Sequence, residues 1–152
     1  MFKKFFVFIL LFFSSQIVFA KEIPVKIKTL EKISTSNPQL QEGDTISLTT
    51  AQNVYVNSKL YIKSGTPVVG VITNLTENGF TCKEASIYAE TFKVKNIEGK
   101  KVPLKGIVFK SGRDHHLFTQ FLPGFYEFIR GGEAMILPNK DTFTLYLETK
   151  DD

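Results

Sequence analysis

The sequence predicts an all-β fold: a small barrel or compact sandwich of about seven to nine mostly antiparallel strands, with one short bent helix and a signal-peptide helix in front. Apolar and polar residues alternate with a period of two through most of the chain after residue 20, as they do in strands with one buried face. Turn residues recur roughly every 8–12 positions, which is typical of a sandwich or barrel. Only within 111–132 does the apolar spacing become helical.

The first twenty residues have the layout of a secretory signal. Lys3 and Lys4 form a cationic head, residues 5–13 are apolar, and small residues stand at the −3 and −1 positions of a cleavage site. We therefore expect cleavage between Ala20 and Lys21. A transmembrane helix needs about 20 apolar residues, many more than the run at 5–13 provides. We therefore expect no membrane span in the mature chain. The signal implies export, to the periplasm or the cell surface.

Residues 21–152 are long enough for a single β-rich domain with its own core. The formal net charge of the chain is +4, and two of these charges belong to the signal. No block of like charge suggests nucleic-acid binding. Cys82 is the only cysteine, which excludes an internal disulfide. A buried small hydrophobe is its expected role, and an intermolecular disulfide or a reactive thiol is the alternative.

The first half of the domain is expected to hold five strands, each bounded by polar or turn residues. A polar connection at 31–42 separates the first two, and Asn57-Ser58 and Ser64-Gly65 are expected turns. Asn78-Gly79 is a strong signal for a two-residue hairpin turn. The expected strands lie at 25–28, 46–48, 54–56, 60–62 and 68–73.

The second half repeats this pattern and adds the helix. Residues 87–94 fit one long strand or two short ones, and Glu98-Gly99 is a turn. On the last strand the odd-numbered residues from 143 to 147 are apolar and should face one way, towards the core. The further strands are expected at 102–110, 134–137 and 142–147.

The helical stretch carries the candidate binding site. Its apolar residues are Leu117, Phe118, Phe121, Leu122, Phe125, Phe128 and Ile129. Pro123-Gly124 should bend it, Asp114 could cap it and Gly131-Gly132 should end it. This aromatic segment, 117–129, spans only about 20 Å as a helix, too short to cross a bilayer.

Two roles for the aromatic segment remain open. It could close one end of the barrel and complete the core, or it could contact a partner groove or a membrane interface. In the second case the binding residues would be Phe118, Phe121, Phe125, Tyr126 and Phe128.

A metal site is the alternative for the residues just before this segment. His115 and His116 are adjacent, with Asp114 beside them and Cys82 as a remote fourth ligand. Adjacent imidazoles point in different directions, unlike the i, i+4 pairs of zinc sites. We therefore expect no metal, no cofactor and no catalytic residue. The chain also lacks G-x-S-x-G, phosphate-loop and H-E-x-x-H motifs.

Four stretches resemble an exported, cell-envelope β-barrel module of bacteria whose function is unknown. They are 43–48 (GDTISL), 61–66 (YIKSGT), 99–106 (GKKVPLKG) and 132–138 (GEAMILP). The same order of features is distantly similar to the C-terminal barrel of the scaffold subunit of type IV secretion and conjugation channels. The resemblance implies an apolar excursion, here 117–129, ahead of a closing hairpin.

The sequence thus predicts a non-enzymatic, exported envelope module that binds a protein partner or a membrane surface through residues 117–129. The alternatives are a small metal-binding protein or enzyme that uses His115 and His116, and a carrier that holds an apolar ligand inside the barrel. A carrier would need an internal cavity, whereas small barrels normally fill their interiors with side chains.

Overall fold

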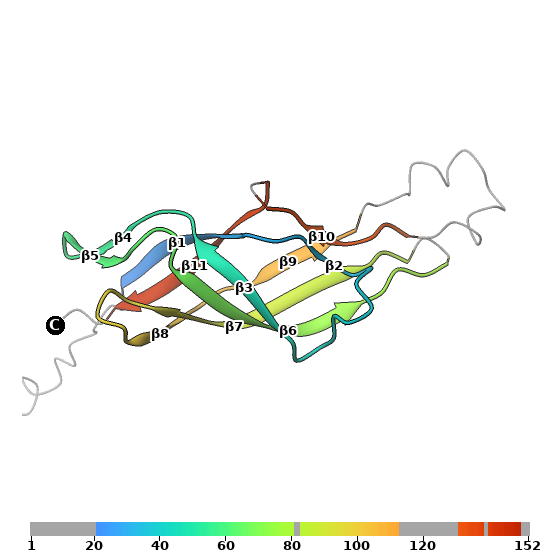
Figure 1. The fold of residues 1–152 in the computed structure, drawn as a ribbon, viewed down its shortest axis with the longest axis horizontal. Coiled ribbons are helices and arrows are strands. Elements are labelled where there is room, and N and C mark those ends of the chain that lie inside the picture. The colour runs from blue at the N-terminus through green and yellow to red at the C-terminus, as the bar shows by residue number, and fades with distance from the viewer. Residues whose placement is uncertain (1–20, 81–82, 113–130, 139, 150–152) are drawn as a thin grey trace, which may run out of the picture.

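The computed structural model describes residues 21–80, 83–112, 131–138 and 140–149. In these ranges the chain forms eleven strands and no helix, so the predicted all-β class is confirmed (Figure 1). Seven strands share one antiparallel sheet, and four short ones form two small sheets, which the sequence estimate undercounted. The expected signal helix and the bent helix at 114–130 lie outside the described residues.

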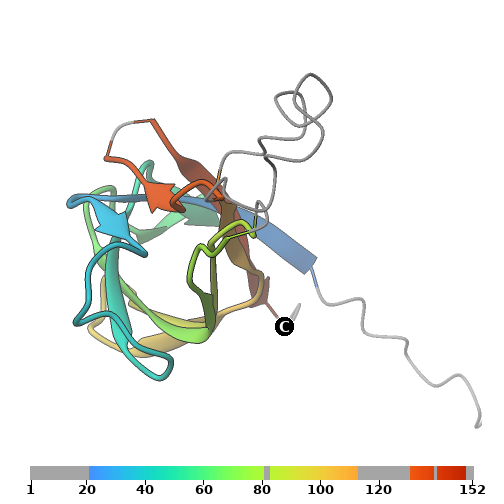
Figure 2. The same cartoon turned by 90° about the vertical axis from the view of Figure 1, so that its right-hand side faces the viewer.

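The main sheet curls into a nearly closed barrel, seen end-on in Figure 2. At its seam, Lys105 and Tyr146 exchange two backbone hydrogen bonds of 2.8 and 2.7 Å, which join the end of β8 to β11. β9 (Val108–Ser111) pairs with β7 beyond the end of β8. The strand order is β11 (Thr142–Thr149), β1 (Lys21–Thr29), β3 (Thr45–Thr50), β6 (Pro67–Thr76), β7 (Ser86–Lys95) and β8 (Lys101–Leu104).

The two small sheets sit outside this barrel path. β4 (Val54–Val56) and β5 (Lys59–Ile62) form a hairpin. Its turn residues Asn57 and Ser58 both have positive φ, 48° and 63°, as a two-residue type I′ turn requires. The turn expected there is therefore confirmed.

The second small sheet corrects two expectations. β2 (Ile33–Ser34) lies inside the stretch expected to be a plain connection, and it pairs with β10 (Met135–Ile136). The expected hairpin between 134–137 and 142–147 does not form, because β11 pairs along its length with β1 instead. The long partner strand offers many more ladder hydrogen bonds than the two-residue β10 could.

The Asn78-Gly79 prediction is also wrong. β6 ends at Thr76 and β7 begins at Ser86, and these two residues are paired, so the connection 77–85 is too long for a two-residue turn. Gly79 N–H instead donates to Lys83 O at 2.9 Å, and Asn78 Nδ2 donates to Gly131 O at 3.0 Å. In place of the tight turn that Asn78-Gly79 predicts, the loop 77–85 therefore makes hydrogen bonds to Gly131, far along the chain.

The stretch 87–94 is one strand with a β-bulge. Val69 faces Lys93 and Val71 faces Glu90, so β7 spends one more residue than β6 between these pairs. Thr91 occupies the extra position with φ of 58°, which is unusual for a β-branched residue. Because of the bulge, Ala89 before it and Phe92 after it both face the core, although they are three positions apart.

The barrel interior is filled by one apolar cluster. Phe92, 1% exposed, is the largest of its fully buried side chains, and its ring lies over Gly70, where an added Cβ would stand 2.3 Å from Cε1. On β11, Leu145 and Leu147 are buried while Thr144 and Tyr146 face outward, as predicted. The barrel-facing strands contribute Val25, Ile27, Ile46, Leu48, Val68, Ile72, Ile87, Ala89, Phe92, Val94, Leu104, Val108, Leu145 and Leu147.

Candidate functional site

The predicted binding residues all lie outside the described part of the chain. These are Phe118, Phe121, Phe125, Tyr126 and Phe128 of the aromatic segment, together with Asp114, His115, His116, Cys82 and the cleavage-site residue Ala20. Lys21 is described. It is exposed at the start of β1, and its carbonyl accepts a hydrogen bond from Thr149 Oγ1 at 3.2 Å.

The structure does show how both ends of the 113–130 stretch are held. Ala85 N–H donates to Gly132 O at 3.1 Å, and Ala85 O accepts from Gly112 N–H at 2.8 Å. Gly131 N–H donates to Gly79 O at 3.0 Å. Residues on either side of 113–130 therefore meet at one point just before β7. Gly112 and Gly132, which flank the stretch, are thus held at the same residue of the barrel rim.

Aromatic side chains lie on the barrel wall next to this point. Tyr88 on β7 and Phe109 on β9 are cross-strand partners, with ring centroids 6.3 Å apart and planes 62° apart. Phe109 is 54% exposed. We call Tyr88, Phe109 and the rim around Ala85 the aromatic end. The pKa of Tyr88 is raised above its ordinary value. The largest cause is a hydrogen bond to the Glu90 carboxylate, followed by partial burial and by the negative charge of Glu90.

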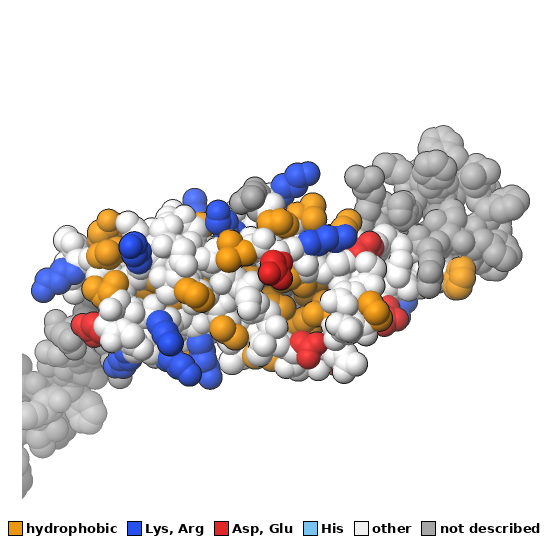
Figure 3. Space-filling view, in the orientation of Figure 1, with side chains coloured by type: hydrophobic (Ala, Val, Ile, Leu, Met, Phe, Trp, Pro, Cys, Tyr) orange, Lys and Arg blue, Asp and Glu red, His pale blue; other side chains and the backbone are white. Residues whose placement is uncertain are grey.

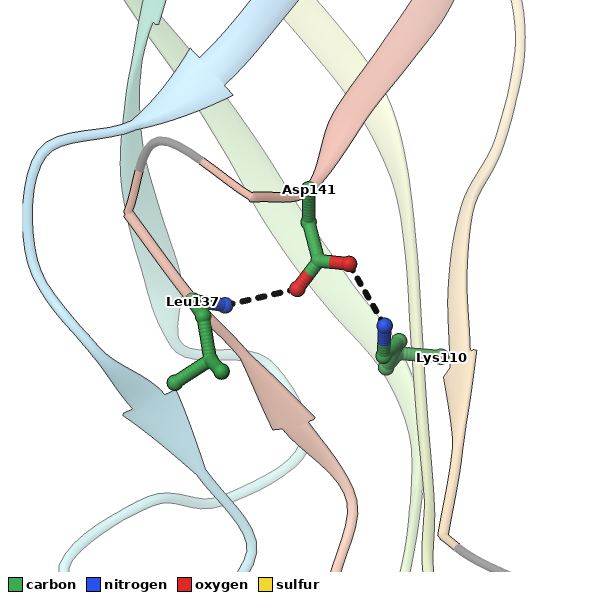
Figure 4. Close-up of polar contacts among 3 residues, drawn as sticks. All are labelled: Lys110, Leu137 and Asp141. Atoms are coloured by element: carbon green, nitrogen blue, oxygen red, sulfur yellow. Dashed lines mark hydrogen bonds and ion pairs between the residues drawn. The ribbon is translucent and has the colours of Figure 1, made fainter.

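An ion pair fixes β9 near the same end of the barrel (Figure 4). The Asp141 carboxylate accepts a hydrogen bond from Leu137 N–H at 2.7 Å and pairs with Lys110 Nζ at 2.5 Å. Burial alone would raise the pKa of Asp141, but the Leu137 N–H and the Lys110 ammonium outweigh it, and the pKa is lowered. This contact ties β9 to the turn between β10 and β11, and its role is structural.

A polar cluster joins Glu133 to β2 and the residues that follow it. The Glu133 carboxylate accepts hydrogen bonds from the hydroxyls of Ser34 and Ser36. Ser34 is buried, and it lies on β2. The cluster thus fastens the stretch after Gly132 to β2. Among the described residues, no three His, Cys, Asp or Glu side chains are grouped so that they could hold a metal ion.

A second surface lies on the outer wall formed by β6, β7 and β8. Lys93 and Lys95 project from β7 and Lys101 from β8, around Pro67 and Val69 of β6. We call these five residues the lysine face. They border an open hollow of about 410 Å³. Figure 3 shows lysine side chains gathered over β7 and β8.

The register of the strands produces this cluster. Lys93 stands opposite Val69 across β6 and β7, and Lys95 stands opposite Lys101 across β7 and β8. In the described part of the chain, the two ion pairs are Lys105–Glu148 and Lys110–Asp141, so the lysine face contributes to neither. Like charges placed directly opposite each other destabilise a sheet.

Sequence reasoning did not find the lysine face. The signal was present in part, because Lys93 and Lys95 are two residues apart and so share one face of a strand. The contribution of Lys101 depends on the β7–β8 register, and that of Val69 on the bulge at Thr91. Neither can be derived from spacing alone.

No family model, curated protein or solved structure matches this chain. In the described ranges there is also no helix with the length and apolar character needed to cross a membrane.

Proposed function

We propose that this protein is a non-enzymatic module of the bacterial cell envelope, exported by its N-terminal signal, that binds another envelope protein through the aromatic segment 117–129. The observation that carries this proposal is the pair of backbone hydrogen bonds that Ala85 makes with Gly112 and Gly132. These bonds bring the described residues that flank 113–130 together at one point of the barrel, next to the Tyr88–Phe109 pair, of which Phe109 is 54% exposed. Aromatic side chains on a rigid support are the usual anchors of protein interfaces.

The resemblance to exported envelope barrels supports the location and the type of function. In those modules an apolar excursion also precedes the final strands. The hydrogen bonds of Ala85 to both Gly112 and Gly132 support such an insertion, because they hold its two flanks together at the end of the barrel.

The alternatives make different demands. A carrier needs an internal cavity, but the inward-facing side chains form one contiguous apolar cluster with exposures of 0–4%, which favours a filled barrel. A metal protein would depend on Asp114, His115 and His116, which lie outside the described residues. Elemental analysis of the purified protein tests it, because a closed metal site would bind zinc or copper stoichiometrically.

Crosslinking and pull-down from whole envelopes test the proposed function. We expect the Phe121→Ser/Phe125→Ser variant to lose a partner protein that the wild type captures. A matched control is Leu30→Ser/Ile97→Ser, which removes two apolar side chains that are 70% and 59% exposed at other sites. Circular dichroism checks that both variants keep the β fold.

The control should capture the same partner as the wild type. An unchanged partner set for Phe121→Ser/Phe125→Ser, with the fold intact, would refute the proposal. Binding of the wild type to lipid vesicles that is lost in this variant, without any loss of a protein partner, would assign the aromatic segment to a membrane interface instead.

A further inference from the structure

We propose that the lysine face binds the anionic headgroups of a phospholipid bilayer, so that the outer wall of β6, β7 and β8 lies against a membrane surface. The inference is independent of the aromatic segment. It rests on the register of three adjacent strands, on three lysines that form no ion pair with any described carboxylate, and on the apolar residues between them.

The charge arrangement is the first step. Lys95 and Lys101 are direct cross-strand partners, a position at which Cβ atoms are about 4.5–5.5 Å apart. Lys93 lies on the same face, and no described carboxylate forms an ion pair with any of the three. Their mutual repulsion is reduced when an anionic surface neutralises them, so binding is favoured by charge complementarity.

The apolar residues are the second step. Val69 is 45% exposed, and the exposed Pro67 begins the same strand. Both border the hollow that the lysines surround. Lysine side chains at membrane interfaces lay their methylene stems along apolar surface and keep their ammonium groups at headgroup level. The combination therefore fits a lipid surface, which offers phosphates and an apolar boundary together.

The shape of the site argues against other anions. A free phosphate is usually held by donors that converge on it, often with backbone N–H groups. Here β7 is the middle strand of three and pairs on both sides, so its backbone is already used. An acidic peptide that adds a strand would pair along a sheet edge, at β8, and would not cover the paired middle strand β7 that carries Lys93 and Lys95. An open, three-strand wall suits a flat, extended anionic surface better.

Vesicle co-sedimentation of the purified protein tests the proposal. The probes are vesicles of phosphatidylcholine with phosphatidylglycerol, and vesicles of phosphatidylcholine alone. We expect binding to the first and not the second, with a loss of binding as salt rises. Each lysine should contribute roughly fivefold, so Lys93→Gln/Lys95→Gln/Lys101→Gln should weaken binding on the order of 100-fold.

The matched control is Lys26→Gln/Lys32→Gln/Lys59→Gln, which removes the same charge from exposed positions on other elements. It should bind within a few-fold of the wild type. Val69→Ser should weaken binding while leaving its salt dependence unchanged. Thermal unfolding confirms the fold, and the lysine-face variant should be at least as stable as the wild type, because like charges have been removed.

Three outcomes would overturn the proposal: equal loss in both triple variants, equal binding to both vesicles, or displacement by inorganic phosphate well beyond that by chloride at the same ionic strength. Polyglutamate that binds the wild type while vesicles do not would assign the face to an acidic protein. Phe121→Ser/Phe125→Ser should keep vesicle binding, which separates this test from that of the proposed function.

Discussion

The lysine face and the aromatic end are built in different ways. Each residue of the lysine face stands on a strand, and its position follows from the register of β6, β7 and β8. The aromatic end combines a cross-strand pair, Tyr88 on β7 and Phe109 on β9, with backbone hydrogen bonds between segments far apart in the chain, centred on Ala85. The first surface therefore lies entirely on the paired strands of the barrel, whereas the second also depends on contacts outside the strands.

The two surfaces also differ in the forces they can use. Three ammonium groups without acidic partners favour binding that salt weakens. Exposed aromatic rings favour binding through buried apolar area, which salt does not weaken. The proposed protein binding and the proposed membrane binding therefore depend on different residues, so variants of each surface should separate them.

The largest expected effect is on the support of the lysine face. In Gly70→Ala the new Cβ would stand 2.3 Å from Phe92 Cε1, and this fully buried ring belongs to the residue that precedes Lys93 on β7. Such overpacking should lower the free energy of unfolding by about 3 kcal/mol, measured by chemical denaturation. The matched control Val71→Ala, at an outward-facing position of the same strand, should change it by under about 1 kcal/mol. Equal effects would show that Phe92 can move aside, and that the wall is less rigid than the comparison requires.

Part of the fold follows from local sequence rules. The turn at Asn57-Ser58 forms where turn chemistry places it, and β11 has the predicted inward and outward faces. In both places the period of two and the turn residues act within a few positions, so no distant contact is needed to specify them.

The misses share one physical cause, which is pairing between distant residues. β2 and β10 are two residues long, and only their mutual pairing makes them strands. The Asn78 side chain donates a hydrogen bond to Gly131 O and does not form a local turn. The lysine face needs the Thr91 bulge to align Val69 with Lys93. Such contacts depend on the whole sheet, so sequence spacing cannot predict them.

A smaller effect is expected at the ion pair that supports the aromatic end. Asp141→Asn removes the charge that Lys110 and Leu137 N–H stabilise, and should lower the free energy of unfolding near neutral pH by about 2 kcal/mol. The pKa of Asp141 is lowered in the folded protein. Its contribution is therefore present above the unfolded pKa, near 3.9, and is lost as pH falls through the lower folded value.

Denaturation curves at several pH values check this prediction. The stability difference between wild type and Asp141→Asn should be constant near neutral pH and should shrink on acidification. A gap that persists below the folded pKa would mean that packing, not charge, fixes β9.

The smallest effect lies at Glu90, where the two surfaces meet. Glu90 is opposite Val71 in the strand that carries Lys93, and its carboxylate accepts a hydrogen bond from Tyr88. Because this bond and the negative charge raise the pKa of Tyr88, Glu90→Gln should lower that pKa towards the ordinary value. In the wild type, the stabilisation from the protonated phenol is present below the unfolded pKa and lost as pH rises through the folded one. Tyrosinate absorbance during alkaline titration, with Tyr88→Phe to assign the signal, measures the change. Glu98→Gln, in the turn between β7 and β8, is the matched control and should leave the titration unaltered.

The same Glu90→Gln variant removes the acidic residue of β7 between the aromatic pair and the lysines, so it should strengthen vesicle binding slightly and leave protein capture as it was. Loss of protein capture would show that the two surfaces are coupled through β7 and not separate.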